Sequence, residues 1–192
     1  MKRNLKLKTL MYPAPAVIAF AYDENGKVDG CTLAFAAMCS HVPPSIMIAI
    51  NHSLKRKTLV DILENKEFTL AFPSAEQVAE ADYFGLASGY DTNKLEDIGF
   101  TYQDAEMVNA PIVNEFKVSL ECKVSNVTSV GSHDQIIAEI VNIQADEDIL
   151  DEKDNIILEK LNPIAYDIFN REYYSLGEKV GDSYKIGLKF KK

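Results

Sequence analysis

A basic segment, His52–Thr58 (HSLKRKT), stands out in a chain that is acidic overall. Lys55, Arg56 and Lys57 place three positive charges just before a predicted short helix, and Thr58 adds a hydroxyl at its start. Free N–H groups and the helix dipole favour an anion at a helix N-terminus, most naturally a phosphate. The alternative is a solvated basic turn in which Thr58 is an ordinary N-cap. The pattern indicates a phosphate site and leaves that alternative open.

A second candidate is the small-residue segment Gly30–His41 (GCTLAFAAMCSH). Small side chains let a flat ligand approach the backbone closely, and Thr32, Ser40 and backbone amides can bond to its edge. The alternative is a tightly packed core strand, which the residues taken alone favour. Cys39 and His41 are only two possible metal ligands, and a zinc site needs more. We therefore predict no metal site.

Two other segments carry weaker patterns. His133 lies in a predicted hairpin turn, where it is either solvated or, beside a ligand, able to donate a hydrogen bond or a proton. The stretch Ala81–Leu95 contains aromatic residues, two glycines and Lys94. It is compatible with a binding lid and equally with a surface loop.

Common catalytic motifs are missing. The chain contains no GxGxxG fingerprint, P-loop, GxSxG elbow or HExxH pair. Their absence argues against Rossmann dehydrogenases, P-loop nucleotide hydrolases and the common hydrolases.

The composition is that of a globular protein with one domain over residues 1–192. Apolar residues make up 47% and charged residues 26%, and the formal net charge is −9. Such a charge argues against nucleic acid or an anionic membrane as a partner. Cys31, Cys39 and Cys122 form no CxxC pair, which favours free thiols. With no signal peptide and no membrane-spanning run recognised, the expected location is the cytoplasm.

The elements that must position these groups are mostly strands. Asn25-Gly26 favours a tight turn between two strands, and the capping-box pattern of Ser74 and Gln77 predicts the start of a helix. Apolar spacing predicts the other elements. Strands are expected over Ala16–Tyr22, Cys31–Ala36, Ser45–Ile50 and Glu67–Phe72, and helices over Thr58–Asn65 and from Ser74 to about Phe84.

The second half of the chain adds a pair of strands. Residues alternate strictly over Phe116–Val127, which predicts a strand whose polar face, including Ser119 and Glu121, is exposed to water. A turn at Gly131–Asp134 leads into a predicted strand over Gln135–Ile143. Many strands with tight turns and two or three helices indicate a mostly β protein, a β-barrel with helical additions.

A series of short motifs follows one order along the chain. They are Tyr12–Pro15, Thr32–His41, Pro43-Pro44, Lys57-Thr58, Asp82–Gly85, Ser88-Gly89, Asn93–Leu95, Gly131–His133, Pro163–Tyr166 and Tyr173–Gly181. In order and spacing they resemble the flavin reductase-like family, the FMN-binding split barrels that include flavoredoxin. The likeness covers nearly the whole chain and is greatest for members of flavoredoxin size.

The resemblance implies a split β-barrel that binds FMN. The 31–37 backbone and Thr32 would line the ring and ribityl chain, and Lys55, Lys57 and Thr58 would hold the phosphate. Lys94 would approach the flavin or its phosphate from its own or a partner subunit. His133 and Lys94 are the implied catalytic candidates, because donors or positive charge stabilise the reduced flavin. The implied FMN contacts are Cys31, Thr32, Leu33, Ala34, Ala37, Cys39, Ser40, His41, Lys55, Lys57, Thr58, Lys94, His133 and Tyr166.

Three positions depart from the family pattern. Cys31 stands where many relatives have Asn, Ala37 stands where flavoredoxin-like members carry a larger aromatic residue, and Gly131-Ser132-His133 replaces Gly-Asp-His. These departures imply weaker binding of FMN and more space on the substrate side of the cofactor.

The resemblance also implies the activity. We expect an FMN-dependent oxidoreductase that takes hydride from NAD(P)H and passes electrons to a flavin, a ferric complex or a redox protein. One alternative is an electron-transfer protein of the flavoredoxin type without direct NAD(P)H reductase activity. Another is a non-catalytic FMN-binding module. The family's barrels are homodimers with the flavin near the interface, so a homodimer is expected.

Overall fold

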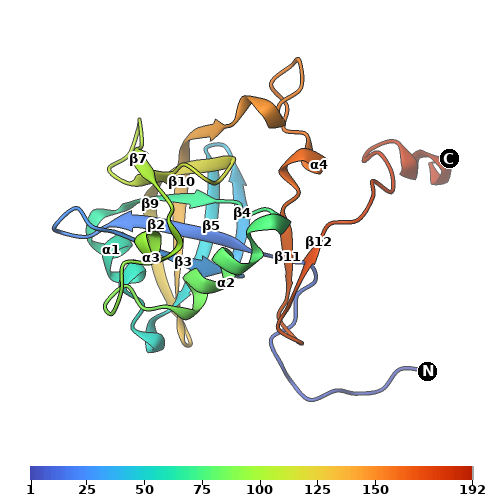
Figure 1. The fold of residues 1–192 in the computed structure, drawn as a ribbon. Helices are drawn as coiled ribbons and strands as arrows, with labels where there is room; N and C mark the ends of the chain where they lie inside the picture. The colour runs from blue at the N-terminus through green and yellow to red at the C-terminus, as the bar shows by residue number, and fades with distance from the viewer. Residues whose placement is uncertain (192) are drawn as a thin grey trace.

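The main sheet consists of seven strands, and every neighbouring pair is antiparallel. The computed structural model describes residues 1–191. The strands are β2 (Val17–Tyr22), β3 (Val28–Leu33), β4 (Ala36–His41), β5 (Pro44–Asn51), β6 (Glu67–Ala71), β9 (Val118–Val130) and β10 (His133–Ala145). Their spatial order is β3-β2-β6-β9-β10-β5-β4, so β3 and β4 form the two edges of the sheet (Figure 1).

The sheet curls into a barrel that stays open between β3 and β4. These strands follow each other in the chain, yet they lie at opposite edges and do not pair. Ala34 and Phe35 cross the gap between them, and Ala49 N of β5 donates to Phe35 O over 2.8 Å. The architecture is therefore a split barrel, as the resemblance implied. The strand predicted over 31–36 is confirmed up to Leu33 as the end of β3, which returns antiparallel to β2. Its predicted end is wrong, because the chain leaves this edge after Leu33 and joins the other edge of the sheet.

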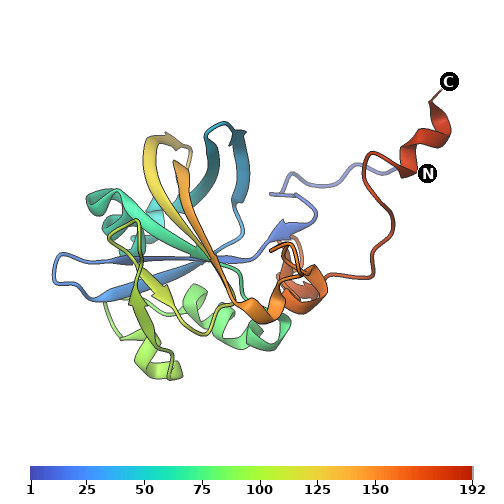
Figure 2. The ribbon, with the colours of Figure 1, turned by 90° about the horizontal axis from the view of Figure 1, so that it is seen from above.

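A small sheet stands beside the barrel. It consists of β1 (Ala14–Pro15), β11 (Ile164–Asp167) and β12 (Glu172–Ser175), in the order β1-β11-β12. Both ends of the chain extend from this side, away from the barrel (Figure 2). A separate pair, β7 (Tyr102–Asp104) and β8 (Pro111–Val113), packs near β2 and β6.

Short helices connect and cover the strands. α2 packs on β3 and β2, whereas α1 packs where β2, β3 and β6 meet. Among residues 1–191, no helix combines the length and the apolar character needed to cross a lipid bilayer. The helices are η1 (His52–Leu54), α1 (Lys57–Asn65), η2 (Ala75–Gln77), α2 (Val78–Leu86), α3 (Lys94–Ile98), η3 (Glu147–Ile149), α4 (Leu158–Leu161) and η4 (Ile186–Phe190).

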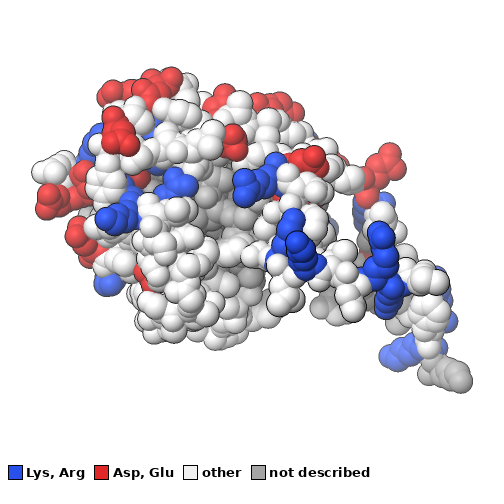
Figure 3. All heavy atoms as spheres, turned by 90° about the horizontal axis from the view of Figure 1, so that it is seen from below, with Lys and Arg blue, Asp and Glu red and all other residues white. Residues whose placement is uncertain are grey.

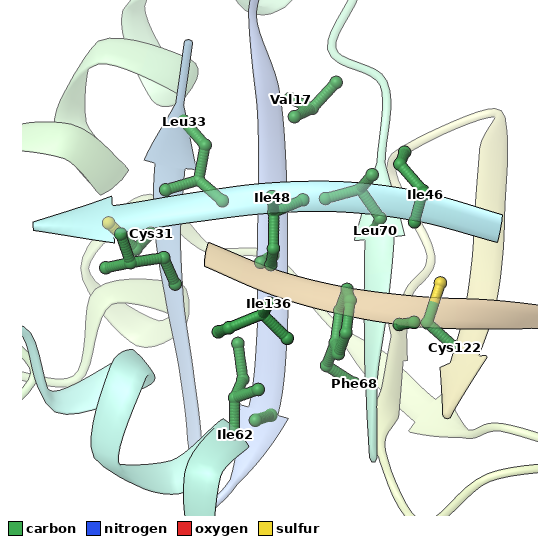
Figure 4. Packing of buried hydrophobic residues seen from close by; sticks show 14 of the residues in the cluster. Val17, Cys31, Leu33, Ile46, Ile48, Ile62, Phe68, Leu70, Cys122 and Ile136 are labelled. Carbon is green, nitrogen blue, oxygen red and sulfur yellow. The ribbon is translucent and has the colours of Figure 1, made fainter. Parts of the chain in front are cut away.

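The interior of the barrel is apolar. Ile48, Phe68 and Ile136 come from three different strands, are fully buried and belong to one cluster (Figure 4). Burying each such side chain contributes about 1.5–3 kcal/mol. Cys31 and Leu33 of β3 belong to the same cluster. The inward side of this edge strand is therefore anchored in the core.

A second cluster lies on the outer face of β2, under α2. Phe20 packs edge-on against Phe84 of α2, with ring centroids 5.1 Å apart. Gly30 of β3 lies directly beneath Phe20, and a Cβ at this position would overlap the phenyl ring. Glycine is required here because it lets the two strands and the aromatic ring approach one another.

Several local predictions are confirmed. The helix predicted over 58–65 is α1, the strands predicted over 45–50 and 67–72 are β5 and β6, and the capping box of Ser74 and Gln77 is present. The N-cap of α1 is Arg56 rather than Thr58, which lies inside the helix. Thr58 is therefore not an ordinary N-cap.

The polar face of β9 contradicts its prediction. Glu121 has 0% exposed surface, and it accepts hydrogen bonds from Met107 N (2.6 Å), Asn142 Nδ2 (2.8 Å) and Gln144 Nε2 (2.9 Å). Burial alone would raise the pKa of Glu121, but the hydrogen bonds outweigh burial and lower it. Alternation predicts an exposed face only where no other segment packs over it, and here the segment between β7 and β8 does.

Candidate functional site

A cavity of about 360 Å³ lies at the split of the barrel. It lies where the edge at β3 approaches the end of β5, and the segments after β5 and β11 complete its walls. The face seen in Figure 3 is hollowed, with Lys and Arg side chains around the hollow. The cavity is lined by Cys31, Thr32, Leu33, Ala34, Phe35, Ala49, Ile50, Asn51, Leu54, Arg56, His133, Tyr166 and Ile168.

One wall of the cavity is the unpaired edge of β3. This strand pairs with β2 alone, so the other edge of its backbone makes no strand ladder. Thr32 Oγ1 donates to the backbone oxygen of Ala81 on α2, so its hydroxyl proton is already used within the protein. Burial raises the pKa of the Cys31 thiol, which stays protonated. This wall therefore offers backbone groups to a ligand, rather than charged side chains.

A cation and a helix start form a second wall. Arg56 lines the cavity, and its Nη2 donates to Gly85 O over 2.7 Å. It is also the N-cap residue of α1, whose first turn contains no acidic side chain. The unpaired N–H groups of this turn and the guanidinium act in the same direction, because both favour an anion. This end of the cavity is suited to a phosphate.

The remaining walls come from distant parts of the chain. His133 is the first residue of β10, its Nδ1 lies 2.9 Å from Ser132 Oγ, and its ring packs 5.0 Å from that of Phe35. The ring of Tyr166 on β11 packs against that of Tyr173 on β12 at a tilt, with ring centroids 5.1 Å apart. An imidazole and a phenol thus meet the edge of β3 across the cavity.

A buried ion pair between Lys94 and Asp29 lies behind the edge of β3. Lys94 Nζ forms an ion pair with Asp29 Oδ1 (3.0 Å) and donates to Gly30 O (2.6 Å). Thr58 Oγ1 donates to Asp29 Oδ2 (2.6 Å), so Asp29 links β3 to both α1 and α3. Asp29 and Lys94 are 3% and 2% exposed. At Gly89 a Cβ would overlap the carboxylate of Asp29, so only glycine fits there.

A second group of ion pairs involves α1. Lys57 Nζ contacts Asp61 one turn later (2.9 Å) and Asp23 in the turn after β2 (3.1 Å). Burial raises the pKa of Asp61 to about 6, in spite of the opposing effect of Lys57. Lys57 therefore faces carboxylates and does not line the cavity.

A sequence model of the "Flavin reductase like domain" family matches residues 9–177. The chain belongs to this family. The flavin reductase-like fold is shared with the flavoredoxin of Desulfovibrio vulgaris (Miyazaki F), with a TM-score of 0.92 and 32% identity over 97% of this chain and 100% of that one. It is also shared with a flavoredoxin from Methanosarcina acetivorans, with a TM-score of 0.91 and 24% identity over 99% of each chain.

A curated relative of this flavin reductase-like chain carries an activity in its name. It is "FMN reductase (NADH) RutF" from Pseudomonas syringae, which is 28% identical over 132 residues, 68% of this chain and 70% of the relative. The flavin reductase-like family identified from the sequence is thereby confirmed, together with its mostly β split-barrel fold.

The structure brings together some of the residues that the sequence nominated. Of the implied FMN contacts, Cys31, Thr32, Leu33, Ala34, His133 and Tyr166 line the cavity. Ala37, Cys39, Ser40 and His41 lie on β4, where all but the half-buried Ser40 are exposed, and Lys55 is exposed in the turn before α1. Lys57, Thr58 and Lys94 lie behind the cavity wall, bound to Asp23, Asp29 or Asp61.

Sequence reasoning did not select Arg56 as the cation of the cavity. A usable signal exists, because Lys57 and Asp61 have the i, i+4 spacing of a helical ion pair. This spacing predicts that Lys57 pairs with Asp61 within the helix, which leaves Arg56 to face a ligand. The other unselected lining residues are Phe35, Ala49, Ile50, Asn51, Leu54 and Ile168. No local pattern distinguishes them from ordinary strand and loop residues.

Proposed function

We propose that the cavity binds FMN and that the protein is an oxidoreductase. It would move hydride or electrons from NAD(P)H to a flavin, a ferric complex or a redox protein. The observation that carries the proposal is the arrangement of the cavity at the split: an unpaired backbone edge along β3 and, at one end, Arg56 beside the first turn of α1. A flat polar ring with a phosphate tail needs both features.

The residues present fit this cofactor. Arg56 and the unpaired N–H groups of α1 would hold the phosphate, since a guanidinium and a helix N-terminus both favour a dianion. The backbone at Cys31–Ala34 would bond to the polar edge of the ring, with little side-chain bulk in the way. The volume of about 360 Å³ is within the range of about 300–1,000 Å³ that is usual for ligand pockets.

The chain itself would bind and orient the reactants. When bound, FMN supplies the redox chemistry by accepting a hydride and passing the electrons on. His133, held by Ser132 and Phe35, would donate a hydrogen bond or a proton at the cavity wall. Lys94 would act from behind β3, where its ammonium and the carboxylate of Asp29 fix the backbone that meets the ring. Lys94 is thus proposed as a positioning residue.

A second candidate function is electron transfer without direct NAD(P)H reductase activity. It is favoured by the 32% identity to a flavoredoxin over nearly the full length of both chains. The two functions share the cofactor and differ in the donor of electrons. A non-catalytic FMN-binding module is the third possibility.

Anaerobic mixing with NADH or NADPH tests these functions. FMN-loaded protein would lose its flavin absorbance rapidly if it is a reductase, and only with a redox protein or dithionite if it is a carrier. Flavin that no redox protein reduces would indicate the non-catalytic module. A protein that gains no flavin absorbance when FMN is added would contradict all three.

We also propose a homodimer. Both terminal segments leave the body of the protein and expose apolar side chains, among them Leu7 near one end and Tyr184 and Phe190 near the other. Such segments are stabilised when a second copy covers them. Sedimentation at micromolar concentration would detect the dimer, and a monomer would contradict it. The cytoplasmic location and the single-domain organisation stay predictions.

A further inference from the structure

A smaller chamber of about 240 Å³ lies beside the first cavity. The two share Thr32, Leu33, Ala34 and Tyr166 in their linings, so they are neighbours across the segment that leaves β3. The other walls of the chamber come from α2, from Ala16 just before β2 and from β12. A molecule in the chamber would therefore lie next to whatever fills the first cavity.

The polar groups of the chamber are Asp82 of α2 and Tyr173 of β12. The Tyr173 hydroxyl donates to Asp82 Oδ1 over 3.0 Å. Burial and this hydrogen bond raise the pKa of Tyr173, so the phenol keeps its proton and stays the donor. Within residues 1–191, Asp82 Oδ2 accepts no hydrogen bond from the protein. The pair thus presents free acceptor positions to a ligand, with one negative charge.

The nearest positive charge does not reverse this preference. Arg56 bonds to the backbone oxygen of Gly85, which lines the chamber, but its guanidinium lines the first cavity. The side chains that complete the chamber are uncharged, and they include Leu86, Tyr166 and Ala16. An anion entering the chamber would meet the carboxylate of Asp82 with no cation among the lining residues.

The size of the chamber limits what it can hold. Pockets for drug-sized ligands measure about 300–1,000 Å³, so a chamber of about 240 Å³ suits a molecule with a single ring. The aromatic walls formed by Tyr166 and Tyr173 suit the face of such a ring. The acceptor pair at Asp82 suits an N–H donor on it.

We propose that this chamber is a binding site for an uncharged single-ring molecule bearing an N–H donor, such as an aromatic carboxamide, and that Asp82 excludes the corresponding carboxylate. The inference rests on the proposed function in one respect: the molecule in the chamber is taken to exchange electrons with the FMN proposed for the first cavity. The binding preference itself requires no cofactor.

Benzamide and benzoate test the preference, because they have nearly the same shape and differ in charge. Ligand-observed NMR titrations of the full chain without cofactor should find benzoate binding at least about tenfold more weakly than benzamide. In Asp82→Asn the difference should fall to within about threefold, because an amide can donate to a carboxylate. Tyr173→Phe should weaken benzamide and is a second route if Asp82→Asn does not fold.

Asp91→Asn is the matched control. It removes one exposed acidic charge from the loop after α2, outside the chamber lining, and should leave the preference unchanged. Equal binding of the two probes, binding of neither, or a preference that survives Asp82→Asn would overturn the inference.

A parallel titration with FMN separates this inference from the proposed function. If FMN binds but benzamide does not, the chamber inference alone fails. If benzamide is preferred over benzoate but FMN does not bind, the chamber stands and the proposed function fails.

Discussion

The segment from Gly30 to His41 divides into two halves with opposite surroundings. The first half, in β3 and the crossover, is anchored in the core, covered by α2 and lines the cavity. The second half is β4, which is largely exposed and contributes no residue to the cavity lining. Both halves consist mainly of small residues. Composition therefore indicates a candidate ligand-binding strand, whereas the position of that strand at one edge of the sheet or the other decides whether it lines the cavity.

The ion pair behind β3 is expected to give the largest effect, because β4 has no such support. Lys94→Met would leave Asp29 buried without its cation, which typically costs about 3–5 kcal/mol. Denaturant unfolding would measure the loss. The double variant Lys94→Met with Asp29→Asn should recover part of it, since the buried charge is then removed. A single variant as stable as the wild type would contradict a supporting role for the pair.

Arg56 and Lys55, two neighbouring cations before α1, differ in whether they face the proposed phosphate site. Arg56→Ala removes the cation that lines the cavity, and loss of a charge-assisted hydrogen bond costs about 1.5–3 kcal/mol. FMN affinity should therefore fall about tenfold or more in a fluorescence titration. Lys55→Ala, at the exposed residue next to it, should change the affinity less than about twofold. Equal losses in the two variants would show that the ligand does not distinguish the two cations.

Protonation of Asp61 should make stability depend on pH in the region behind the cavity. The pKa is raised to about 6 in the folded protein, so the folded state binds the proton more tightly than the unfolded state. Stability from this group is therefore present at low pH and lost as pH rises from about 4 to 6, by roughly 3 kcal/mol. Asp61→Asn should remove that component, measured as the difference from the wild type in unfolding free energy at pH 4 and 7. Parallel pH profiles would contradict the raised pKa.

The smallest effect is expected from the thiols, whose reactivity distinguishes the buried β3 from the exposed β4. Cys39 on β4 is exposed, whereas Cys31 and Cys122 are buried, and burial raises the pKa of both, that of Cys122 to about 12. A thiol reagent should therefore modify Cys39 alone in the native protein. Added FMN should not slow the reaction, because β4 does not line the cavity. Cys39→Ser should change stability by less than about 0.5 kcal/mol. Protection of Cys39 by FMN would place β4 at the site after all.

Local structure could be predicted where short-range physics decides it. The α1 helix follows from apolar spacing, and the capping box at Ser74 follows from two residues three positions apart. The buried polar face of β9 could not be predicted, because Glu121 depends on Met107, Asn142 and Gln144. These partners come from another segment and from the neighbouring strand, and alternation along β9 carries no information about them.

The sequence by itself determined the mostly β character, the basic turn before a helix and the family resemblance, because each rests on residue types within a few positions or on motif order. Only the tertiary structure decided which groups meet at the cavity. Arg56 rather than Lys57 faces it, and β3 rather than β4 lines it. The physical reason is that a charged side chain is stable away from water only beside a group of opposite charge. The carboxylates that hold Lys57 and Lys94 reach them only when the strands and helices have packed.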